Sequence, residues 1–409
     1  MEQTEREKIE LSNKIHPYFA GFTCDLLFWF SINTIFLTIV KKFNASQISI
    51  ISGVAIFLTI ILQGPALKII KKIGNIKSVR LGLFLLLISA IIITFGKSFE
   101  IILFGHVIYH VAFFFTGMNS VILKRNLKAT NREKDFAKLQ GKISIIYSVI
   151  TMIISFISGF IFNINNYLPM IFCIMSCIFN IFLSRYIYEY EVKTENMEDK
   201  VNGVSWNKLI IIIILAYGLL YATVETLQEN GKLFILYKLK DFISENKSVV
   251  YLTIVIAFSR IFRVLSNIFF YKIYKKTKDK YIVLLNIVMT ISILTMIIGN
   301  IMLSGNLACF VMAIGFCMIL FIRDPIENFC KIELLNNCNI KEQEEVMHRF
   351  NLSRRIFRSL LAAIIGTLLT KIKMIYIMII LLILSISYLG ITLNLSKELN
   401  NKYNKNRNF

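Results

Sequence analysis

This sequence has few charged residues with which to cover a hydrophobic core. Only 17% of its 409 residues are charged and four are proline, whereas 56% are hydrophobic, including 34 phenylalanines. A water-soluble protein needs enough polar residues to cover its core, and this composition does not supply them. The composition therefore excludes an ordinary soluble globular protein and indicates one whose outer solvent is lipid.

Motifs of several enzyme classes are also missing. The chain has no glycine-rich loop ending in Lys-Ser/Thr, no nucleophile elbow, no zinc signature and no long soluble loop on which to build a site. Cys173 and Cys177 share a helical face, but no histidine or acidic ligand lies near them in sequence, so we interpret them as buried small hydrophobic residues. We expect no metal, no cofactor and no enzymatic activity. An intramembrane acyl transferase using His106 or His110 with a nearby acid is the disfavoured alternative.

Long apolar runs are what the chain has instead. Twelve of them follow one another, each about the 20 residues that a helix needs to cross roughly 30 Å of hydrocarbon. Continuous runs rather than alternation predict helices and not a β-barrel, so the expected fold class is an all-α integral membrane protein. The expected spans are 16–40, 46–67, 79–96, 99–122, 143–164, 167–187, 207–230, 248–271, 281–303, 306–329, 352–370 and 373–395.

The loops between these spans carry an uneven positive charge. The chain has 46 Lys and Arg against 25 Asp and Glu, a net charge of +21, and the basic residues concentrate at both termini and in every second loop. The positive-inside rule then predicts a multi-pass protein of the cell membrane with both termini in the cytoplasm. Attraction of the basic loops to anionic lipids explains the charge, so we expect membrane lipids and no nucleic acid as partners. The first apolar segment lacks a cleavage site and is expected to remain as an anchor.

The chain divides into two similar halves. Residues 188–206 are polar, charged and close to the midpoint, which is typical of a linker. The basic end of the second span, 68–72, is matched by that of the eighth, 272–276. We therefore predict two six-helix bundles related by pseudo-twofold symmetry. The expected segments are a cytoplasmic start 1–15, a first bundle 16–187, the linker 188–206, a second bundle 207–396 and a cytoplasmic tail 397–409.

This architecture resembles the major facilitator superfamily. In that family the loop after the second helix typically carries Gly, then Asp-Arg, then Gly followed by basic residues; here Gly74 and the basic residues fit, whereas Lys71 occupies the Asp position. The proline- and glycine-rich fifth-helix motif of antiporters is reduced to Gly159. The resemblance implies a secondary active transporter of a small-molecule substrate, in which the first, fourth, seventh and tenth helices line a central cavity.

Ionisable residues inside the spans fall mostly on those four helices. Such groups cost at least a few kcal/mol in the bilayer, so they usually face a water-filled cavity or a partner. The candidates for substrate binding or ion coupling are Asp25, His106, His110, Glu225, Arg260 and Arg263, and those for gating are Gly74, Arg323, Asp324 and Pro325.

These candidates suggest different roles. Asp25 and Glu225 are predicted to face the path between the bundles and to take up protons, with His106 assisting. A helix-bonded carboxylate at Asp25 and a packed histidine pair are the structural alternatives. Arg260 and Arg263 require an anionic substrate or an acidic partner such as Glu225.

Charges nearer the span ends have simpler interpretations. The stretch from Arg323 to Glu327 suits a gate or a snorkelling pair equally, and Pro325 is expected to break or kink its helix. Glu229 is interpreted as solvated. Arg354, Arg355 and Arg358 are interpreted as surface anchors.

The predicted function is proton-coupled movement of a small solute by alternating access, in a protein expected to be a monomer. The alternative is a multidrug or amphipathic-cation efflux pump, which Asp25 and the aromatic residues 28–30 favour. Uptake of an anionic or zwitterionic metabolite is favoured instead by Arg260 and Arg263. A membrane-embedded sensor is disfavoured because no soluble output domain is present in the chain.

Overall fold

The computed structural model describes residues 3–132, 135–190, 207–338 and 343–405, and within these ranges every regular element is helical. The prediction of an all-α protein is therefore confirmed. The chain forms two compact units, one made of Met1–Lys41 with Val54–Glu198 and the other of Lys42–Gly53 with Asp199–Phe409. The predicted linker 188–206 contains this division, although 191–206 lie outside the described residues. The predicted bundle boundaries stay a prediction.

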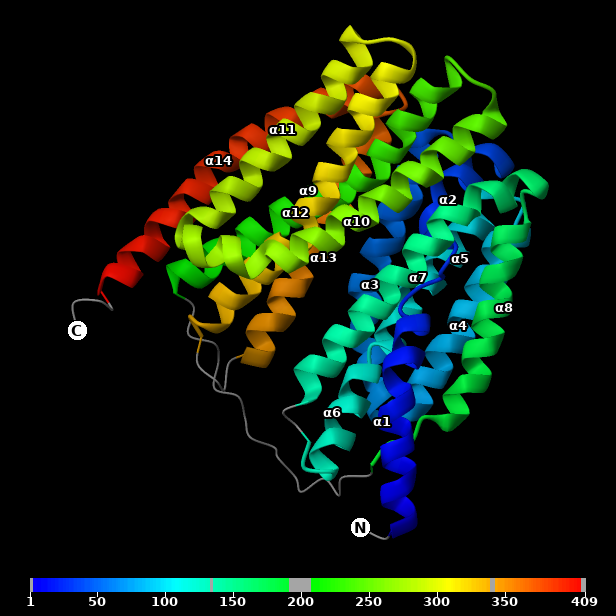
Figure 1. Ribbon diagram of the computed structural model, residues 1–409, viewed down its shortest axis with the longest axis vertical. Helices are drawn as coiled ribbons and strands as arrows, with labels where there is room; N and C mark the ends of the chain where they lie inside the picture. Colours follow the sequence, from blue (N-terminus) through cyan, green and yellow to red (C-terminus); the bar gives the residue numbers. More distant parts are fainter. Residues whose placement is uncertain (1–2, 133–134, 191–206, 339–342, 406–409) are drawn as a thin grey trace. The chain divides into compact units, whose positions relative to one another are not determined.

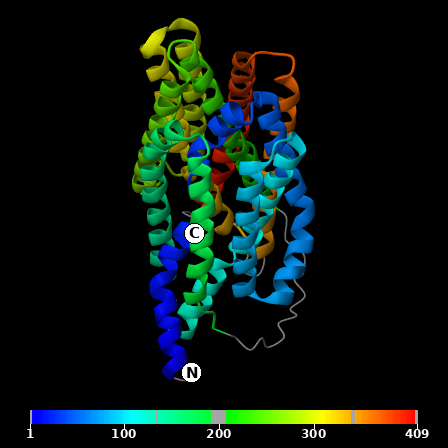
Figure 2. The ribbon, with the colours of Figure 1, turned by 90° about the vertical axis from the view of Figure 1, so that its right-hand side faces the viewer.

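The first unit is built from the helices up to α8, coloured blue to green in Figure 1. α4 and α5 pack against each other along their lengths (Figure 2), and the Ser98 hydroxyl begins α5 by accepting the Ile101 N–H at 3.3 Å. The elements are α1 (Gln3–Thr23), α2 (Trp29–Ile35), the π-helical η1 (Phe36–Val40), α3 (Ala45–Ile73), α4 (Asn75–Phe95), α5 (Phe99–Thr116), α6 (Asn119–Ala129), α7 (Phe136–Ile164), α8 (Leu168–Leu183) and η3 (Ser184–Tyr186). The start of α3, up to Gly53, belongs to the second unit.

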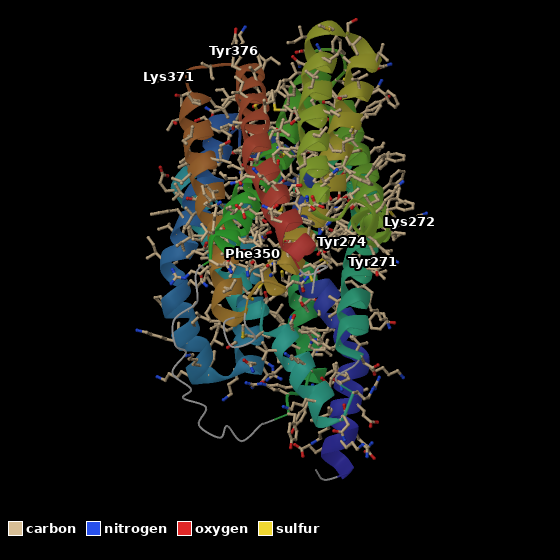
Figure 3. All side chains as sticks on the ribbon, turned by 90° about the vertical axis from the view of Figure 1, so that its left-hand side faces the viewer. Tyr271, Lys272, Tyr274, Phe350, Lys371 and Tyr376 are labelled. Atoms are coloured by element: carbon tan, nitrogen blue, oxygen red, sulfur yellow. The ribbon has the colours of Figure 1, made fainter. Side chains whose placement is uncertain are left out.

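The second unit is organised around α9, which packs against α12, α13 and α14. The Asn207 side chain begins α9 by accepting the Ile210 N–H at 2.8 Å. Figure 3 labels Lys371 and Tyr376 at the turn between α13 and α14. The elements are α9 (Lys208–Lys240), α10 (Glu245–Thr277), η4 (Lys278–Lys280), α11 (Tyr281–Met302), α12 (Gly305–Leu335), α13 (Gln343–Leu368) and α14 (Met374–Lys405).

Nine helical runs in the described ranges are long and apolar enough to cross a membrane, judged by length and composition. Two of them contain two α-helices: Glu245–Met302 contains α10 and α11, and Phe99–Ala129 contains α5 and α6. Large apolar side chains on these runs lie on the surface: Phe95 is 61% exposed, Phe104 59% and Phe310 64%. Such a surface is stable in lipid and a liability in water, which agrees with a multi-pass membrane protein.

The first expected span is not one helix. α1 runs without a break from Gln3 to Thr23, the chain leaves helical conformation, and α2 resumes at Trp29. Thus the segment 1–15, expected as a separate polar start, is mostly the first part of α1. Non-helical backbone at membrane depth is tolerated where protein surrounds it or it lines a cavity, so the break marks a place to look for function.

Lys41 lies at the C-terminal end of this broken span, directly after η1. Its Nζ donates to the carbonyl oxygens of Thr94 at 2.7 Å and Gly96 at 2.8 Å, where α4 ends. The ammonium also lies 5.2 Å from the ring centre of Phe36 and 5.9 Å from that of Tyr167. Burial lowers the pKa of Lys41. The side chain thereby satisfies the free carbonyls at the end of α4 and holds η1 against it.

The tenth expected span is one continuous helix. Pro325 was expected to break or kink it, but α12 runs from Gly305 to Leu335 with Pro325 buried inside it, so the expected break does not occur. A proline removes one helical hydrogen bond and can crowd the preceding turn. Here α12 is packed by α9, α10 and α11, and these contacts keep the helix continuous.

The close contact between α11 and α12 depends on Gly315. A Cβ at this position would lie 2.6 Å from Met296 Cγ and 2.7 Å from the Ser292 carbonyl oxygen. Backbone cannot yield as a flexible side chain can, so we expect Gly315→Ala to destabilise the protein by about 1–3 kcal/mol. Gly390→Ala in α14 is the matched control, because no atom lies within 4 Å of its Cβ position and alanine is the better helix former. Thermal unfolding in detergent should lower Tm for the first variant only; equal values would contradict the prediction.

Candidate functional site

The first cluster of ionisable residues lies at the break between α1 and α2. Asp25 Oδ1 accepts the Leu26 N–H at 2.7 Å and the Tyr109 hydroxyl at 2.5 Å, and Oδ2 accepts the Tyr147 hydroxyl at 3.3 Å. Tyr109 comes from α5 and Tyr147 from α7. Asp25 is therefore bonded both to local backbone and to two other helices, and its predicted role in proton uptake stays a prediction.

Tyr109 also connects Asp25 to the two histidines of α5. The ring centre of His106 lies 6.4 Å from that of Tyr109 and 5.4 Å from that of Trp29, in edge-on geometry. The His110 ring lies 5.0 Å from Tyr109. His106 is buried, and its Nε2 has no hydrogen-bond partner within the described ranges. The structure thus brings the three predicted coupling residues of the first unit into one cluster, while their role in coupling stays a prediction.

The second cluster surrounds Glu225 in the second unit. Arg323 of α12 approaches one carboxylate oxygen at 3.6 Å, and Arg354 of α13 approaches the other at 4.0 Å. Both distances exceed a normal hydrogen bond, so two arginines share one carboxylate loosely. The side chains of Arg323, Glu225 and Arg354 are 19%, 20% and 30% exposed, which leaves their polar groups partly accessible.

Tyr221 lies one helical turn before Glu225 and is buried. Its hydroxyl accepts a hydrogen bond from Arg323 Nε at 3.2 Å. The guanidinium carbons of Arg323 and Arg354 lie 5.8 Å and 5.2 Å from its ring centre. One tyrosine thereby orients both arginines.

A second pair follows one turn later and is tightly bonded. Arg358 forms an ion pair with Glu229, and its Nη1 donates to the Thr226 hydroxyl at 2.7 Å. Ser52 donates to the other oxygen of Glu229 at 2.5 Å. The side chains of Arg358 and Glu229 are only 7% and 15% exposed.

Two interpretations from the sequence are therefore wrong. Glu229 is not a solvated carboxylate, and neither Arg354 nor Arg358 is a surface anchor. The cause is the packing of α9 along α13, in which two glutamates four residues apart meet two arginines four residues apart. That matched spacing was present in the sequence and would have suggested the pairing.

The remaining arginines of α10 separate into two cases. Arg263 Nε pairs with Asp324 Oδ2 at 2.7 Å, and Asn267 donates to the same oxygen at 2.8 Å. Glu225 therefore pairs with arginines of α12 and α13. Arg263 pairs instead with a different acidic residue, Asp324. Arg260 is fully buried on α10, at 1% exposure. Arg323 and Asp324, although adjacent, point to different helices and belong to different ion pairs.

The loop before α4 is held by a residue that the sequence did not suggest. Gly74 has a φ of 84°, a conformation that glycine adopts without strain. Glu189 accepts bonds from the Asn75 side chain at 2.5 Å, the Ile76 N–H at 3.1 Å and Arg125 at 2.9 Å. Gly74 is thus explained by backbone geometry, and its role in gating is still a prediction.

The described ranges offer no group of three residues suited to hold a metal ion. Cys173 and Cys177 are both buried in α8. A groove of about 570 Å³ lies between α9, α10 and α12, but its lining is apolar and includes the exposed Phe258 and Phe310. It contains none of the ionisable candidates, so we place the functional site at the two clusters above.

Known proteins resemble this chain in sequence profile and in fold. A profile of the Major Facilitator Superfamily matches residues 18–324. The nucleoside transporter NupG superposes with a TM-score of 0.71 at 13% identity, over 97% of this chain and 99% of that one. A bacterial homologue of the iron transporter ferroportin, in an inward-facing state, gives 0.69 at 12% identity over 97% and 100%. The POT family transporter PepTSo gives 0.68 at 9% over 98% and 99%. Comparison with curated protein sequences finds no match.

The structural likenesses, at such low identity, show the fold. The family profile covers most of the chain and confirms the resemblance seen in the sequence. It also confirms a transporter of the multi-pass membrane type and not an enzyme. The chain belongs to the Major Facilitator Superfamily.

Proposed function

We propose that this protein moves a small solute across the cell membrane by alternating access and couples the movement to protons. The observation that carries the coupling is the arrangement at Glu225, whose carboxylate is shared at 3.6 Å and 4.0 Å by two arginines. A loosely held carboxylate can change its partner or its protonation state at a smaller cost than a tightly bonded one.

Protonation of Glu225 removes the negative charge between Arg323 and Arg354. The guanidinium groups stay charged, so we assign proton uptake in this cluster to the carboxylate. In the first unit, Asp25 is the corresponding carboxylate, and it is held more tightly because it accepts the Tyr109 hydroxyl at 2.5 Å. His106 lies beside that tyrosine and extends the polar cluster. We assign proton uptake to Asp25 and Glu225, one carboxylate in each unit.

The proposal includes the finer architecture. It has twelve spans in two six-helix bundles with pseudo-twofold symmetry, the broken segment 16–40 and the arginine-bearing 352–370 each counting as a span. The nine apolar runs and the concentration of basic residues in alternate loops support this topology, with both termini in the cytoplasm. The working unit is a monomer surrounded by membrane lipids.

Transport by purified full-length protein in liposomes tests the function. Solutes that raise Tm in a thermal-shift screen are supplied with a radioactive label, and flux is followed with and without an imposed pH gradient. We expect accumulation that requires the gradient and is abolished by a protonophore. Flux that is equal in both conditions would reject proton coupling but keep a transporter.

Efflux of amphipathic cations is the second candidate, favoured by the surroundings of Asp25. Tyr109 bonds to this carboxylate, and Phe28 and Trp29 follow it closely in the chain; the Phe28 ring lies 5.5 Å from that of Phe172 in tilted geometry, and the Trp29 ring lies 5.4 Å from that of His106. If this candidate is right, the protein makes a hypersensitive host resistant to tetraphenylphosphonium, and Asp25→Asn removes the resistance. An unaltered resistance profile counts against it.

A further inference from the structure

We propose that Arg323 and Arg354, oriented by Tyr221, bind an anionic group of the transported solute, either a carboxylate or a phosphate. This inference rests on the proposed function and names its substrate class. Its starting point is Arg354, which the sequence placed at the membrane surface and which the structure places beside Glu225.

Glu225 is shared by two arginines that it holds loosely. Arg323 lies 3.6 Å and Arg354 4.0 Å from its carboxylate oxygens, and both distances exceed that of a hydrogen bond. Two guanidinium groups thus share one carboxylate. A guanidinium held away from its counter-ion at membrane depth is costly, and an anionic ligand at hydrogen-bonding distance reduces that cost.

The neighbouring pairs show that this loose geometry is local. Arg358 with Glu229, and Arg263 with Asp324, are one-to-one pairs at hydrogen-bonding distance with additional polar partners. The same helices therefore can build tight pairs. At Glu225 they do not, and both arginines stay 3.6 Å and 4.0 Å from the carboxylate. The donors of the two side chains are consequently not used up by Glu225.

Geometry favours an oxyanion as the ligand. Arginine presents a planar fork of donors that matches the two oxygens of a carboxylate or phosphate. Here the forks come from two helices, α12 and α13, and both lie against the ring of Tyr221 on α9. A buried tyrosine holds the two guanidinium groups in place, which reduces the entropy that binding would otherwise cost.

Competition links this site to protons. The solute anion and the Glu225 carboxylate seek the same two arginines, so protonation of Glu225 frees donors for the solute. The groups that interact with Glu225 are Arg323 from α12, Arg354 and Arg355 from α13, and Tyr217 and Tyr221 on its own helix; Glu327 of α12 interacts with the same two tyrosines. Anion affinity should rise as pH falls, and binding of an anion with uptake of a proton is the basis of symport.

Equilibrium binding to the purified full-length protein tests the site. The probes are inorganic phosphate, a hexose phosphate, succinate and lactate, with glucose as the neutral probe and tetraphenylphosphonium as the cationic one. We expect at least one anion to raise Tm, and Arg323→Gln or Arg354→Gln to weaken its binding about tenfold or more. Arg349→Gln, an exposed position on α13, is the matched control and should leave the affinity unchanged.

Glu225→Gln provides a readout that misfolding cannot imitate. Removing the competing carboxylate should tighten anion binding at neutral pH and flatten its pH dependence, measured with lactate, whose charge is constant over the range used. Glu327→Gln serves as the comparison, because a flattened profile in that variant alone would assign the proton to Glu327 and overturn the competition at Glu225.

The outcomes separate the inference from the proposed function. A response to phosphates alone or to carboxylates alone identifies the anionic group. Absence of stabilisation by every anion, or anion binding that survives both arginine substitutions, overturns the inference, and flux of a neutral solute would still support the function. Arginine-dependent anion binding without flux in liposomes retains the site and rejects transport.

Discussion

Arg358→Leu is expected to reduce stability by about 3–5 kcal/mol, enough to prevent folding of many proteins. The leucine fills part of the space but leaves Glu229 as a charge that is 15% exposed and has lost its ion pair. Thr226 also loses its donor. The cost arises from the stranded carboxylate, so the free energy of unfolding should fall far more than for removal of a surface charge.

Two variants show whether the stranded charge is the cause. Combining Glu229→Gln with Arg358→Leu removes the orphaned carboxylate and should recover a large part of the stability. Arg6→Leu breaks an exposed ion pair with Glu10, whose partners are 64% and 53% exposed, and should change stability by less than about 0.5 kcal/mol. Thermal or denaturant unfolding in detergent measures all three. Similar losses for Arg358→Leu and Arg6→Leu would show that the buried pair contributes no more than the surface pair.

Asp25→Asn combined with Glu225→Gln is expected to abolish accumulation against a gradient. The amides keep the shape and part of the hydrogen bonding of the carboxylates but cannot take up a proton. One proton moving down one pH unit supplies about 1.4 kcal/mol, which supports about a tenfold concentration ratio of the solute. Without a proton-binding group that ratio should fall to about one.

Liposome assays distinguish loss of coupling from loss of the protein. Exchange of labelled for unlabelled solute requires no net energy, so it should persist in the double variant if the protein is folded. Each single substitution then shows which unit carries the proton. Glu10→Gln, on the exposed part of α1, is the control. Accumulation by the double variant at the level of the unsubstituted protein would rule out these two carboxylates as the coupling groups.

The predictions that agree with the structure are those that depend on the hydrophobicity of consecutive residues. Apolar runs predicted the helical class, and most helix positions follow the expected spans because hydrophobic length is a local property. The expected helix break at Pro325 does not occur, since a helix packed on several sides tolerates a proline that an isolated helix would not. The prediction from the sequence also missed the break after Thr23, where the chain leaves the helix at Asp25 and the side chain bonds to other helices.

The candidate site was predicted in part. Asp25, His106 and Glu225 were selected because charge inside a span is costly wherever it occurs. Arg354 and Glu189 were not selected, since a basic residue at a span end and an acid in a linker are ordinary in sequence. The ion-pair partner of a charged residue cannot be assigned from the spacing of charged residues within its own helix. Arg263 was expected beside Glu225 or another acid, and α10 places it beside Asp324.

By itself the sequence determined that this is a helical membrane protein with ionisable residues in its apolar segments, because hydropathy and charge act through composition and local order. Only the tertiary structure decided which charges meet. α9, α12 and α13 bring Glu225 between Arg323 and Arg354 while pairing Glu229 with Arg358. Electrostatic energy depends on distances of a few ångströms between residues far apart in the chain, and those distances exist only after the helices have packed.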